Sequence, residues 1–393
     1  MTPPNLTQFR AEMQDNGLVH LVFDCPGRSM NVFSNQAIHE LGEFAEWLHR
    51  ADVKGVLVRS GKATGFCAGA DLTELGVAYD MIVAAPAADR FDMAFGHFFP
   101  LSHAIRRMET AGKPVAAAIA GLALGGGCEL ALGAHYRVVT SNRRAMLGLP
   151  ECGVGLLPGA GGTQRMPRLV GVALGLEVLL LGRTLSGEEA REAGLVHAVV
   201  AEGEEIAAAE EWLLSDRAHA VQPWDDAAQP LPHAAYADAI AAHRTREMAR
   251  MLGHEPAPLA ILDCVEFGLM QPIDGAIRAE MSVFAHLIQR PEPRNMIRTM
   301  FLGKRAYDKA SREGTLSPAV IVASEAITRL VVSAMPEHPD LTTALGSLAP
   351  EIGQIAAKLS PAEMLQLDHA VTLSGAIPAY AGGASGALER VAA

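Results

Sequence analysis

The sequence is poor in the features that mark several classes of protein. Only 5% of its 393 residues are aromatic and 19% are charged, and the net charge is −12 at pH 7. An acidic balance argues against a nucleic-acid-coating surface, because phosphate binding needs clustered Lys and Arg. The longest apolar stretch, residues 115–124, is far shorter than a membrane span, and the opening residues lack a basic segment followed by an apolar core. We therefore predict a cytoplasmic globular protein with no membrane span.

Residue patterns for metal binding and for nucleophilic catalysis are also missing. The five cysteines include no CxxC pair and are odd in number, which favours a reducing compartment. The fourteen histidines show no HExxH or other tight ligand spacing, and there is no GxSxG segment, so no metal site or serine nucleophile is predicted. Cys67 and Cys128 have no nearby His in the sequence and are interpreted as packing residues.

What the chain does have is length and apolar content. Half of its residues are apolar, which is enough for burial to offset the conformational entropy of folding. Its length suits a catalytic domain of about 250 residues and an appended piece of about 130. Over the first 200 residues, strand-like and helical patterns alternate. Apolar runs at 18–23 and 54–59 flank a helical segment at 35–50, and a strand at 114–120 leads through three glycines into a helix and then into a strand at 136–140.

The alternation ends between residues 183 and 200, with a helix that begins at Ser186, stops at Gly194 and leads into a last strand. Beyond about residue 200 the strand signal fades and long helical patterns follow, broken by proline-containing loops. In residues 315–393 the apolar residues predict about three helices that pack together rather than a disordered extension. The predicted breaks between these helices lie at four prolines: Pro336, Pro339, Pro350 and Pro361.

Two segments rich in small residues follow predicted strands. In LALGGGCEL, residues 122–130, three glycines lead into a helix, where a ligand can approach the backbone and free N–H groups at the helix N-terminus. In TGFCAGADL, residues 64–72, small residues again expose the backbone. Each segment alone is explained equally well by a tight packing turn. Together they offer two converging N–H groups, which suit the oxyanion of acyl-thioester chemistry.

Two glutamates accompany these segments. Glu129 lies in the first turn of the helix after the glycines, and Glu151 lies in the loop LGLPECGVG. Taken singly, Glu129 is a favourable charge at a helix N-terminus and Glu151 an exposed loop acid. Beside an oxyanion site, the pair supplies what addition of water to a conjugated thioester needs: one carboxylate to deprotonate the water and one to exchange a proton with the α-carbon. The run at 158–171 lacks the Lys-Ser/Thr ending of a phosphate-binding loop, so no nucleotide fold is predicted.

The order and spacing of three segments resemble the enoyl-CoA hydratase/isomerase (crotonase) superfamily over about residues 15–205: GFCAGADL, GLALGGGCEL and LPECGVGLLPGAGGTQRMPRLVG. Two later stretches, at 264–287 and 294–309, resemble the linker that follows the N-terminal hydratase half of multifunctional fatty-acid oxidation proteins. The resemblance implies an α/β fold, a crotonase-type spiral of repeated β-β-α units followed by an all-helical C-terminal region. It divides the chain into a catalytic core at 1–205, a linker-like helical region at 206–310 and a helical appendage of unknown role at 311–393.

The resemblance also implies roles for individual residues. Ala70 and Gly126 would donate the two oxyanion N–H groups, and Glu129 and Glu151 would be the catalytic carboxylates. A bent coenzyme A would lie against six residues of two segments: Arg28, Ser29, Met30, Ala68, Asp71 and Leu72. Arg28 either meets a CoA phosphate or is a solvated surface arginine.

The activity implied is hydration of a trans-2-enoyl-CoA to a 3-hydroxyacyl-CoA, with no metal or redox cofactor and with coenzyme A as part of the substrate. One alternative is a Δ3,Δ2-enoyl-CoA isomerase that uses Glu151 alone. Another is a subunit or scaffold for a separate dehydrogenase or thiolase, because no GxGxxG follows Lys309. The resemblance also suggests a homo-oligomer. Acyl chain length, ring specificity and subunit number stay open.

Overall fold

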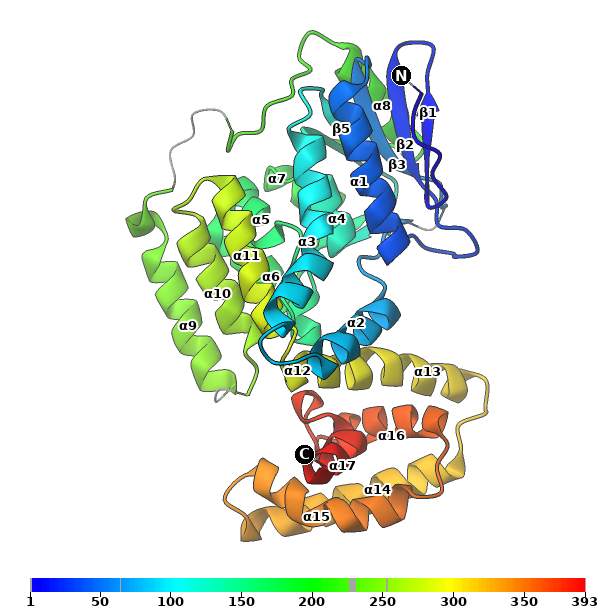
Figure 1. Cartoon of the computed structure of the whole chain (residues 1–393), viewed down its shortest axis with the longest axis vertical. Helices are drawn as coiled ribbons and strands as arrows, with labels where there is room; N and C mark the ends of the chain where they lie inside the picture. Colours follow the sequence, from blue (N-terminus) through cyan, green and yellow to red (C-terminus); the bar gives the residue numbers. More distant parts are fainter. Residues whose placement is uncertain (1, 64, 226–230, 252–253, 393) are drawn as a thin grey trace. The chain divides into compact units, whose positions relative to one another are not determined.

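The computed structural model describes nearly the whole chain, in four ranges: 2–63, 65–225, 231–251 and 254–392. Thr64, the first residue of the TGFCAGADL motif, lies outside them. The chain forms two compact units (Figure 1). The first unit comprises Met1–Cys152, Leu156–Arg250 and Ala257–Gln289, and the second comprises Gly153–Gly155, Met251–Pro256 and Arg290–Ala393. The break after Gln289 falls inside the predicted helical region 206–310.

Two sheets form the frame of the first unit. The larger sheet has six strands in the order β1 (Phe9–Met13), β2 (Leu18–Phe23), β3 (Gly55–Ser60), β5 (Val115–Ile119), β7 (Tyr136–Thr140) and β10 (Ala198–Val200). The smaller sheet has four strands in the order β4 (Gly65–Cys67), β6 (Leu122–Leu124), β8 (Met146–Gly148) and β9 (Thr184–Ser186). Neighbouring strands are parallel except in the pairs β1–β2 and β8–β9.

Successive strands pass from the larger sheet to the smaller one and then into a helix. Strands β3, β5 and β7 belong to the larger sheet, and the strand that follows each of them, β4, β6 or β8, belongs to the smaller sheet. Helix α2 (Leu72–Ala84) follows β4, helix α4 (Gly126–Leu132) follows β6, and the short helix η1 (Glu151–Val154) with helix α5 (Gly162–Val170) follows β8. This repetition confirms the predicted spiral of β-β-α units.

The larger sheet forms because its central strands are apolar on both faces. Every residue of β2 and of β5 is buried, which is typical of parallel strands covered on both sides. Helix α8 (Glu205–Leu214) packs Trp212 and Leu213 against apolar residues of β2, β3, β5 and β7. Helices α1 (Asn35–Arg50) and α3 (Arg90–Glu109) pack against each other.

Several predicted elements are found where the sequence places them. The strands at 18–23 and 136–140 and the helix at 35–50 coincide with β2, β7 and α1. Ser186 caps helix α7 (Gly187–Glu192) through a reciprocal capping box with Glu189, so the local capping signal was sufficient to predict this helix start.

The first unit also contains helices from beyond residue 205. These are α9 (Ala237–Met251), α10 (Ala257–Gly268) and α11 (Ile273–Leu287). Helices α10 and α11 pack against each other and against α5, α10 also touches α6 (Val172–Leu181), and α11 lies along α3. The helices that follow the β-β-α units therefore contribute to the same compact unit as the sheets.

The second unit is helical. Its elements are α12 (Pro291–Met296), the π-helical segment η3 (Ile297–Gly303), α13 (Lys304–Arg312), α14 (Pro318–Ala334), α15 (Leu341–Ala356), α16 (Pro361–Leu373) and α17 (Gly383–Ala392). Four helices, rather than about three, follow residue 315. Pro350 does not separate two helices, as predicted, but lies inside α15. The cost of the missing backbone N–H is offset by burial of nearby residues, since Ala349 is buried and Ile352 belongs to the core of the bundle.

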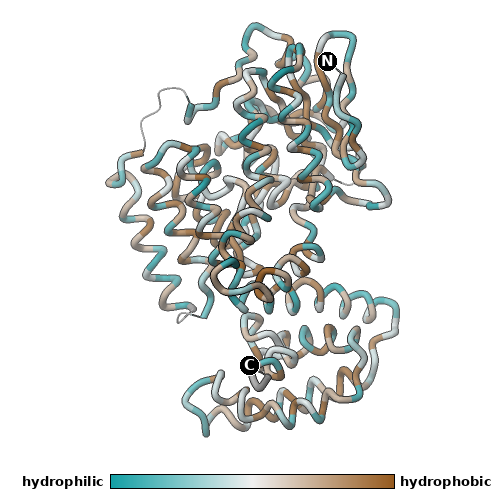
Figure 2. Tube along the Cα trace, in the orientation of Figure 1, coloured by the Kyte–Doolittle hydropathy of each residue, from teal (hydrophilic) through white to brown (hydrophobic). Residues whose placement is uncertain are grey.

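One helix of this unit is long and apolar enough to cross a membrane by length and composition. It spans Pro318–Glu337 with a mean hydropathy of 1.5, and no other helix among the described residues passes that test. Figure 2 shows apolar positions recurring along the helices of this unit. Val320, Ile327 and Val331 of α14 belong to the core of the bundle. Because a core helix meets the same criterion, this is weak evidence for a membrane span.

Candidate active site

The three motif segments meet at one edge of the smaller sheet. Strands β4, β6 and β8 are parallel neighbours, so their carboxyl ends lie side by side. The loop at 68–71 follows β4, the glycines at 125–127 follow β6, and the segment at 149–151 follows β8. Three segments that are separate in the sequence are thereby brought together.

Glycine is required at two positions where these segments touch. Gly69 has a φ of 94°, and a Cβ there would lie 3.2 Å from the Leu124 carbonyl oxygen and 3.6 Å from the Gly126 nitrogen. Gly125 has a φ of 53°, and a Cβ there would lie 2.7 Å from Glu151 Oε1. Any larger residue would push the loops apart or displace the carboxylate.

The N–H groups of Ala70 and Gly126, the two predicted oxyanion donors, are not used by the bridge or the helix to which these residues belong. Ala70 pairs with Phe33 in an isolated bridge whose hydrogen bonds run from Phe33 N to Gly69 O (2.8 Å) and from Asp71 N to Phe33 O (3.0 Å). The Ala70 N–H therefore has no partner in that bridge. Gly126 is the first residue of α4, and the N–H groups of a first helical turn have no partner within the helix.

Glu129 is buried against the start of α5. Its Oε1 accepts hydrogen bonds from Ala160 N (2.7 Å) and from Gly162 N (2.8 Å), and the residue is 2% exposed. Burial raises the pKa of Glu129 to about 7, even though the two N–H groups and the charge of Arg165 oppose the shift. This carboxyl group can therefore gain or lose a proton near neutral pH.

Glu151 lies in a different environment. Its Oε2 is buried and has no hydrogen-bond partner among the described residues. Burial, followed by the charge of Glu129, raises the pKa of Glu151 well above its usual range. The pKa of each of these neighbouring carboxyl groups is thus raised, but only Glu129 has N–H donors that favour its ionised form, and such a difference in surroundings is found where one acid and one base share a site.

A third buried carboxylate belongs to the same cluster, and the sequence analysis missed it. Glu280, on α11, is fully buried; its Oε1 accepts from Gly161 N (2.7 Å), and its Oε2 accepts from Thr163 N (3.0 Å) and from the Thr163 hydroxyl. Burial and the charge of Glu129 raise the pKa of Glu280 to about 8. A signal did exist, because Glu280 lies three or four residues from Ile277 and Phe284 on the apolar stripe of its helix.

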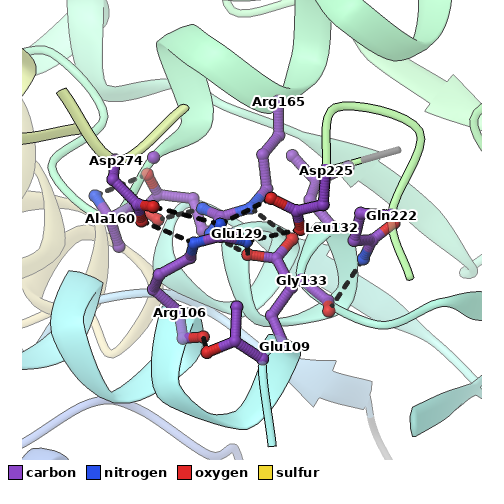
Figure 3. Close-up of polar contacts among 12 residues, drawn as sticks. Arg106, Glu109, Glu129, Leu132, Gly133, Ala160, Arg165, Gln222, Asp225 and Asp274 are labelled. Atoms are coloured by element: carbon purple, nitrogen blue, oxygen red, sulfur yellow. Dashed lines mark hydrogen bonds and ion pairs between the residues drawn. The ribbon is translucent and has the colours of Figure 1, made fainter. Parts of the chain in front are cut away.

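A chain of ion pairs fixes the same loop from another side (Figure 3). Arg165 is fully buried and donates to Ala160 O (3.0 Å) and to Glu109 Oε2 (2.8 Å). Glu109 also accepts from Arg106, whose guanidinium reaches two further carboxylates, Asp225 at 2.6 Å and Asp274 at 2.7 Å. The loop that holds Glu129 is thus anchored through its carbonyl as well as through its N–H groups.

The predicted coenzyme A residues lie close to this edge but differ in their surroundings. Arg28 Nη2 pairs with Asp71 Oδ2 at 2.6 Å, so Arg28 is held in place although its side chain is 47% exposed. Asp71 also caps α2 by accepting from Thr73 N. Ala68 and Ser29 are exposed, Leu72 begins α2, and Met30 packs against Gly65.

Asn31, which the sequence analysis did not single out, anchors the first of these segments. The side chain is fully buried, and its Nδ2 donates to Phe23 O (2.7 Å) and to Phe66 O (3.0 Å). Its Oδ1 accepts from Cys25 N (3.0 Å). One amide thereby ties the turn at 27–31 to the ends of β2 and β4, but no spacing in the sequence marks it.

All five cysteines are buried thiols that form no disulfide. Burial raises the pKa of the Cys67 thiol to about 12 and also raises that of Cys128, which agrees with a packing role for both. In the part of the chain that the structure describes, no group of three or more His, Cys, Asp or Glu residues is arranged to hold a metal ion.

The chain belongs to the enoyl-CoA hydratase/isomerase family, whose profile matches residues 14–249. Among its relatives, the fatty acid oxidation complex subunit alpha of Shewanella loihica is 36% identical over 320 residues, which is 80% of this chain and 43% of the relative. The subunit alpha of Shewanella frigidimarina is 33% identical over 313 residues, 78% of this chain and 42% of the relative. The chain thus spans less than half the length of these proteins. The predicted resemblance, to the superfamily and to fatty-acid oxidation proteins, is confirmed.

A solved structure shares the fold. The enoyl-CoA hydratase from Bacillus halodurans aligns with a TM-score of 0.53, covering 74% of this chain and 99% of that protein at 18% identity.

Proposed function

We propose that the protein hydrates trans-2-enoyl-CoA thioesters to 3-hydroxyacyl-CoA thioesters. The observation that carries the proposal is the meeting of two carboxyl groups with different proton affinities, Glu129 and Glu151, beside two unpaired backbone N–H groups. Family membership supports an enzyme of this class, while the choice of hydration over isomerisation is argued from these residues.

The first part of the mechanism is stabilisation of negative charge. The thioester carbonyl oxygen would accept hydrogen bonds from the N–H groups of Ala70 and Gly126. As water adds to the β-carbon, electrons move through the conjugated system onto this oxygen. Preorganised donors stabilise the resulting enolate, and one such donor is typically worth roughly 3 kcal/mol. The α4 N-terminus adds the positive end of its dipole.

Proton transfer then falls to the two acids. Glu129 is the base, because the N–H groups of Ala160 and Gly162 favour its ionised form and its Oε2 is not used by them. It takes a proton from water as the oxygen bonds to the β-carbon. Glu151, which favours the protonated state, gives its proton to the α-carbon and closes the addition. Coenzyme A would be held by Arg28, Ser29, Met30, Ala68, Asp71 and Leu72, and no metal or redox cofactor is proposed.

The direct test uses the purified protein with crotonyl-CoA and longer 2-enoyl-CoA thioesters. Loss of the conjugated-thioester absorbance is the expected result, with the 3-hydroxyacyl product identified by mass. Glu192→Gln, an exposed acid on α7, serves as a control that should retain the parent rate. Absence of hydration at every chain length would refute the proposal.

One observation favours a second candidate, Δ3,Δ2-enoyl-CoA isomerisation. Glu129 Oε1 is committed to two loop N–H groups, as a purely structural acid would be, whereas Glu151 has an unpaired oxygen. If Glu151 alone shuttles the proton, Glu129→Gln should retain activity on a 3-enoyl-CoA while Glu151→Gln loses it. Loss of activity in both variants favours hydration.

The relatives are named as subunits of a complex, and we propose that this chain also associates, either as a homo-oligomer or with a separate dehydrogenase or thiolase. Light scattering of the pure protein tests the first arrangement, and co-elution with those two enzymes tests the second. A cytoplasmic location, without nucleic acid or membrane partners, stays a prediction.

A further inference from the structure

Four consecutive backbone N–H groups at the start of α5 point alternately to two carboxylates. Ala160 and Gly162 donate to Glu129 at 2.7 and 2.8 Å. Gly161 and Thr163 donate to Glu280 at 2.7 and 3.0 Å. Residues 160–163 are therefore held between two acids that come from different helices, α4 and α11.

Glu280 is held firmly enough to define this geometry. Helix α11 packs against α3, α5 and α10, and Phe284, one turn beyond Glu280, stacks edge-on against Phe98 at 5.0 Å. Ile277, almost one turn before it, lies beside Gly161. The Thr163 hydroxyl gives Glu280 a third donor. The Glu280 carboxyl group thus has little freedom to move. Its position fixes the direction of the N–H groups of Gly161 and Thr163, which donate hydrogen bonds to it.

A glutamate that served only as a packing residue at position 280 would destabilise the fold. Its neighbours on the stripe are apolar, and removing a carboxyl group from water costs several kcal/mol unless partners compensate. Two other acids belong to the same cluster: Glu129, which is buried, and Glu151, which is half-buried with its Oε2 fully enclosed. An apolar side chain would cost less but would leave the N–H groups of Gly161 and Thr163 buried without an acceptor.

We propose that Glu280 is a positioning residue for the reaction: by holding the N–H groups of Gly161 and Thr163, it turns those of Ala160 and Gly162 toward Glu129 and so fixes the base. This inference rests on the proposed function. It assigns a part in the chemistry to a helix outside the family's β-β-α units, more than 100 residues from the loop it orders.

Charged and titratable groups on several elements face Glu280. They are Glu129 on α4, Arg165 and Arg168 on α5, Cys264 on α10 and Glu151 on η1. The charge of Glu280 contributes to the raised pKa of Glu151. Because the pKa of Glu280 is about 8, this charge is present mainly above that pH, so a neutral residue at 280 should displace the alkaline part of the pH–rate profile, which a residue with only a structural role would not do.

The main test replaces Glu280 by Gln and by Ala and measures kcat and KM for a 2-enoyl-CoA. We expect kcat to fall about tenfold in Glu280→Gln and about 100-fold in Glu280→Ala, as for loss of one or more buried hydrogen bonds, with KM within about threefold. Thr163→Val, which removes only the hydroxyl donor, should lower kcat two- to fivefold, and it remains informative if the changes at 280 prevent folding. Unchanged kcat in folded variants, or a change in KM alone, would overturn the proposal.

A readout without turnover separates this inference from the proposed function. Amide hydrogen exchange of Ala160 and Gly162 should be slow in the parent protein and faster in Glu280→Gln, while the core strand β5 keeps its protection. If the parent protein hydrates no enoyl-CoA but this exchange pattern is found, the function fails and the positioning of the loop stands. Exchange at Ala160 and Gly162 that is unaffected by Glu280→Gln overturns the positioning role, whatever the activity.

Discussion

Both units of the molecule bury acidic side chains, but they surround them differently. In the second unit, Asp368 accepts from Ser385 N (2.8 Å) and Ser385 Oγ (2.7 Å) and lies 3.5 Å from the Arg298 guanidinium. Burial raises the pKa of Asp368, and Arg298 opposes that shift. In the first unit, Glu151 has a buried oxygen without a partner among the described residues and the charge of Glu129 nearby. A buried acid that is fully paired supports a fold, whereas one left partly unpaired is available for proton transfer.

The residues buried in the helical bundle of the second unit also differ from those buried around the active-site loop of the first. The core of the second unit consists of Val, Ile, Leu and Ala side chains from α14, α15, α16 and α17 and the turn before α17. Around the active-site loop, by contrast, Thr163, Gln164, Arg165 and Glu280 are completely buried. Buried polar pairing surrounds the active-site loop, whereas the core shared by α14 to α17 is apolar, so substitutions at these two places should have different signatures.

The largest effect is expected from removing the unpaired acid. Glu151→Gln deletes a proton-transfer group and should lower kcat for hydration by about 10² to 10⁴. Acyl-CoA affinity should change little, because Gln has the same shape. Steady-state kinetics with calorimetric binding of a saturated acyl-CoA checks both. A rate within threefold of the parent would show that Glu151 does not transfer the proton.

A substitution that creates a cavity in the second unit should lower the stability of the protein without changing kcat. Leu367 is completely buried, and Leu367→Ala should lower the free energy of unfolding by about 2 to 5 kcal/mol. The matched control is Leu373→Ala on the same helix, where the side chain is 68% exposed and the expected change is below about 0.5 kcal/mol. Denaturant unfolding measures both, and kcat at a temperature where each variant is folded should equal that of the parent. Equal losses at the two positions would contradict the burial seen here.

Glu151 should also destabilise the folded protein at pH 8. Because its pKa is higher in the folded than in the unfolded protein, Glu151 keeps its proton in the folded state while the unfolded chain releases it above about pH 4.5. The contribution of Glu151 to the free energy of unfolding is thus lost as the pH rises toward the pKa that Glu151 has in the folded protein. Glu151→Gln should therefore be more stable than the parent at pH 8, and the difference should shrink as the pH falls toward 5. Unfolding curves at both pH values decide this, and a destabilised variant at pH 8 would contradict the direction of the shift.

The smallest effect concerns an exposed pair. Arg28→Ala removes the partner of Asp71 and the proposed contact to coenzyme A, and KM should rise less than about tenfold with kcat unchanged. Comparison of an enoyl-CoA with an enoyl-pantetheine, which lacks the nucleotide phosphates, separates the two roles. A rise in KM for both substrates points to the pair with Asp71, and a rise only for the CoA thioester points to a phosphate contact.

The parts of the site that the sequence predicted are those carried by local motifs. Glu129, Glu151 and the glycine-rich segments were located because each lies in a distinctive run of residues. Glu280 was not, because its partners, Gly161 and Thr163, are more than 100 residues away and only tertiary packing brings them together. Strands β4, β6 and β8 were not predicted as a sheet, since three residues are too few to display an alternating pattern. At Pro350 the sequence predicted a break between helices that the structure does not contain. Pro350 lies inside α15, because burial of the residues around it outweighs the local tendency of proline to end a helix.

The smaller sheet has a consequence for how such an enzyme can diversify. In the proposed mechanism, each of three adjacent strand ends delivers a different chemical component: β4 delivers one N–H donor, β6 the second donor with one acid, and β8 the other acid. Residues that follow a strand can be exchanged without disturbing the ladder behind them. A lineage, or a protein engineer, can therefore alter one component while inheriting the others intact, so that new reactions of acyl thioesters become accessible through changes of a few residues rather than through a new fold.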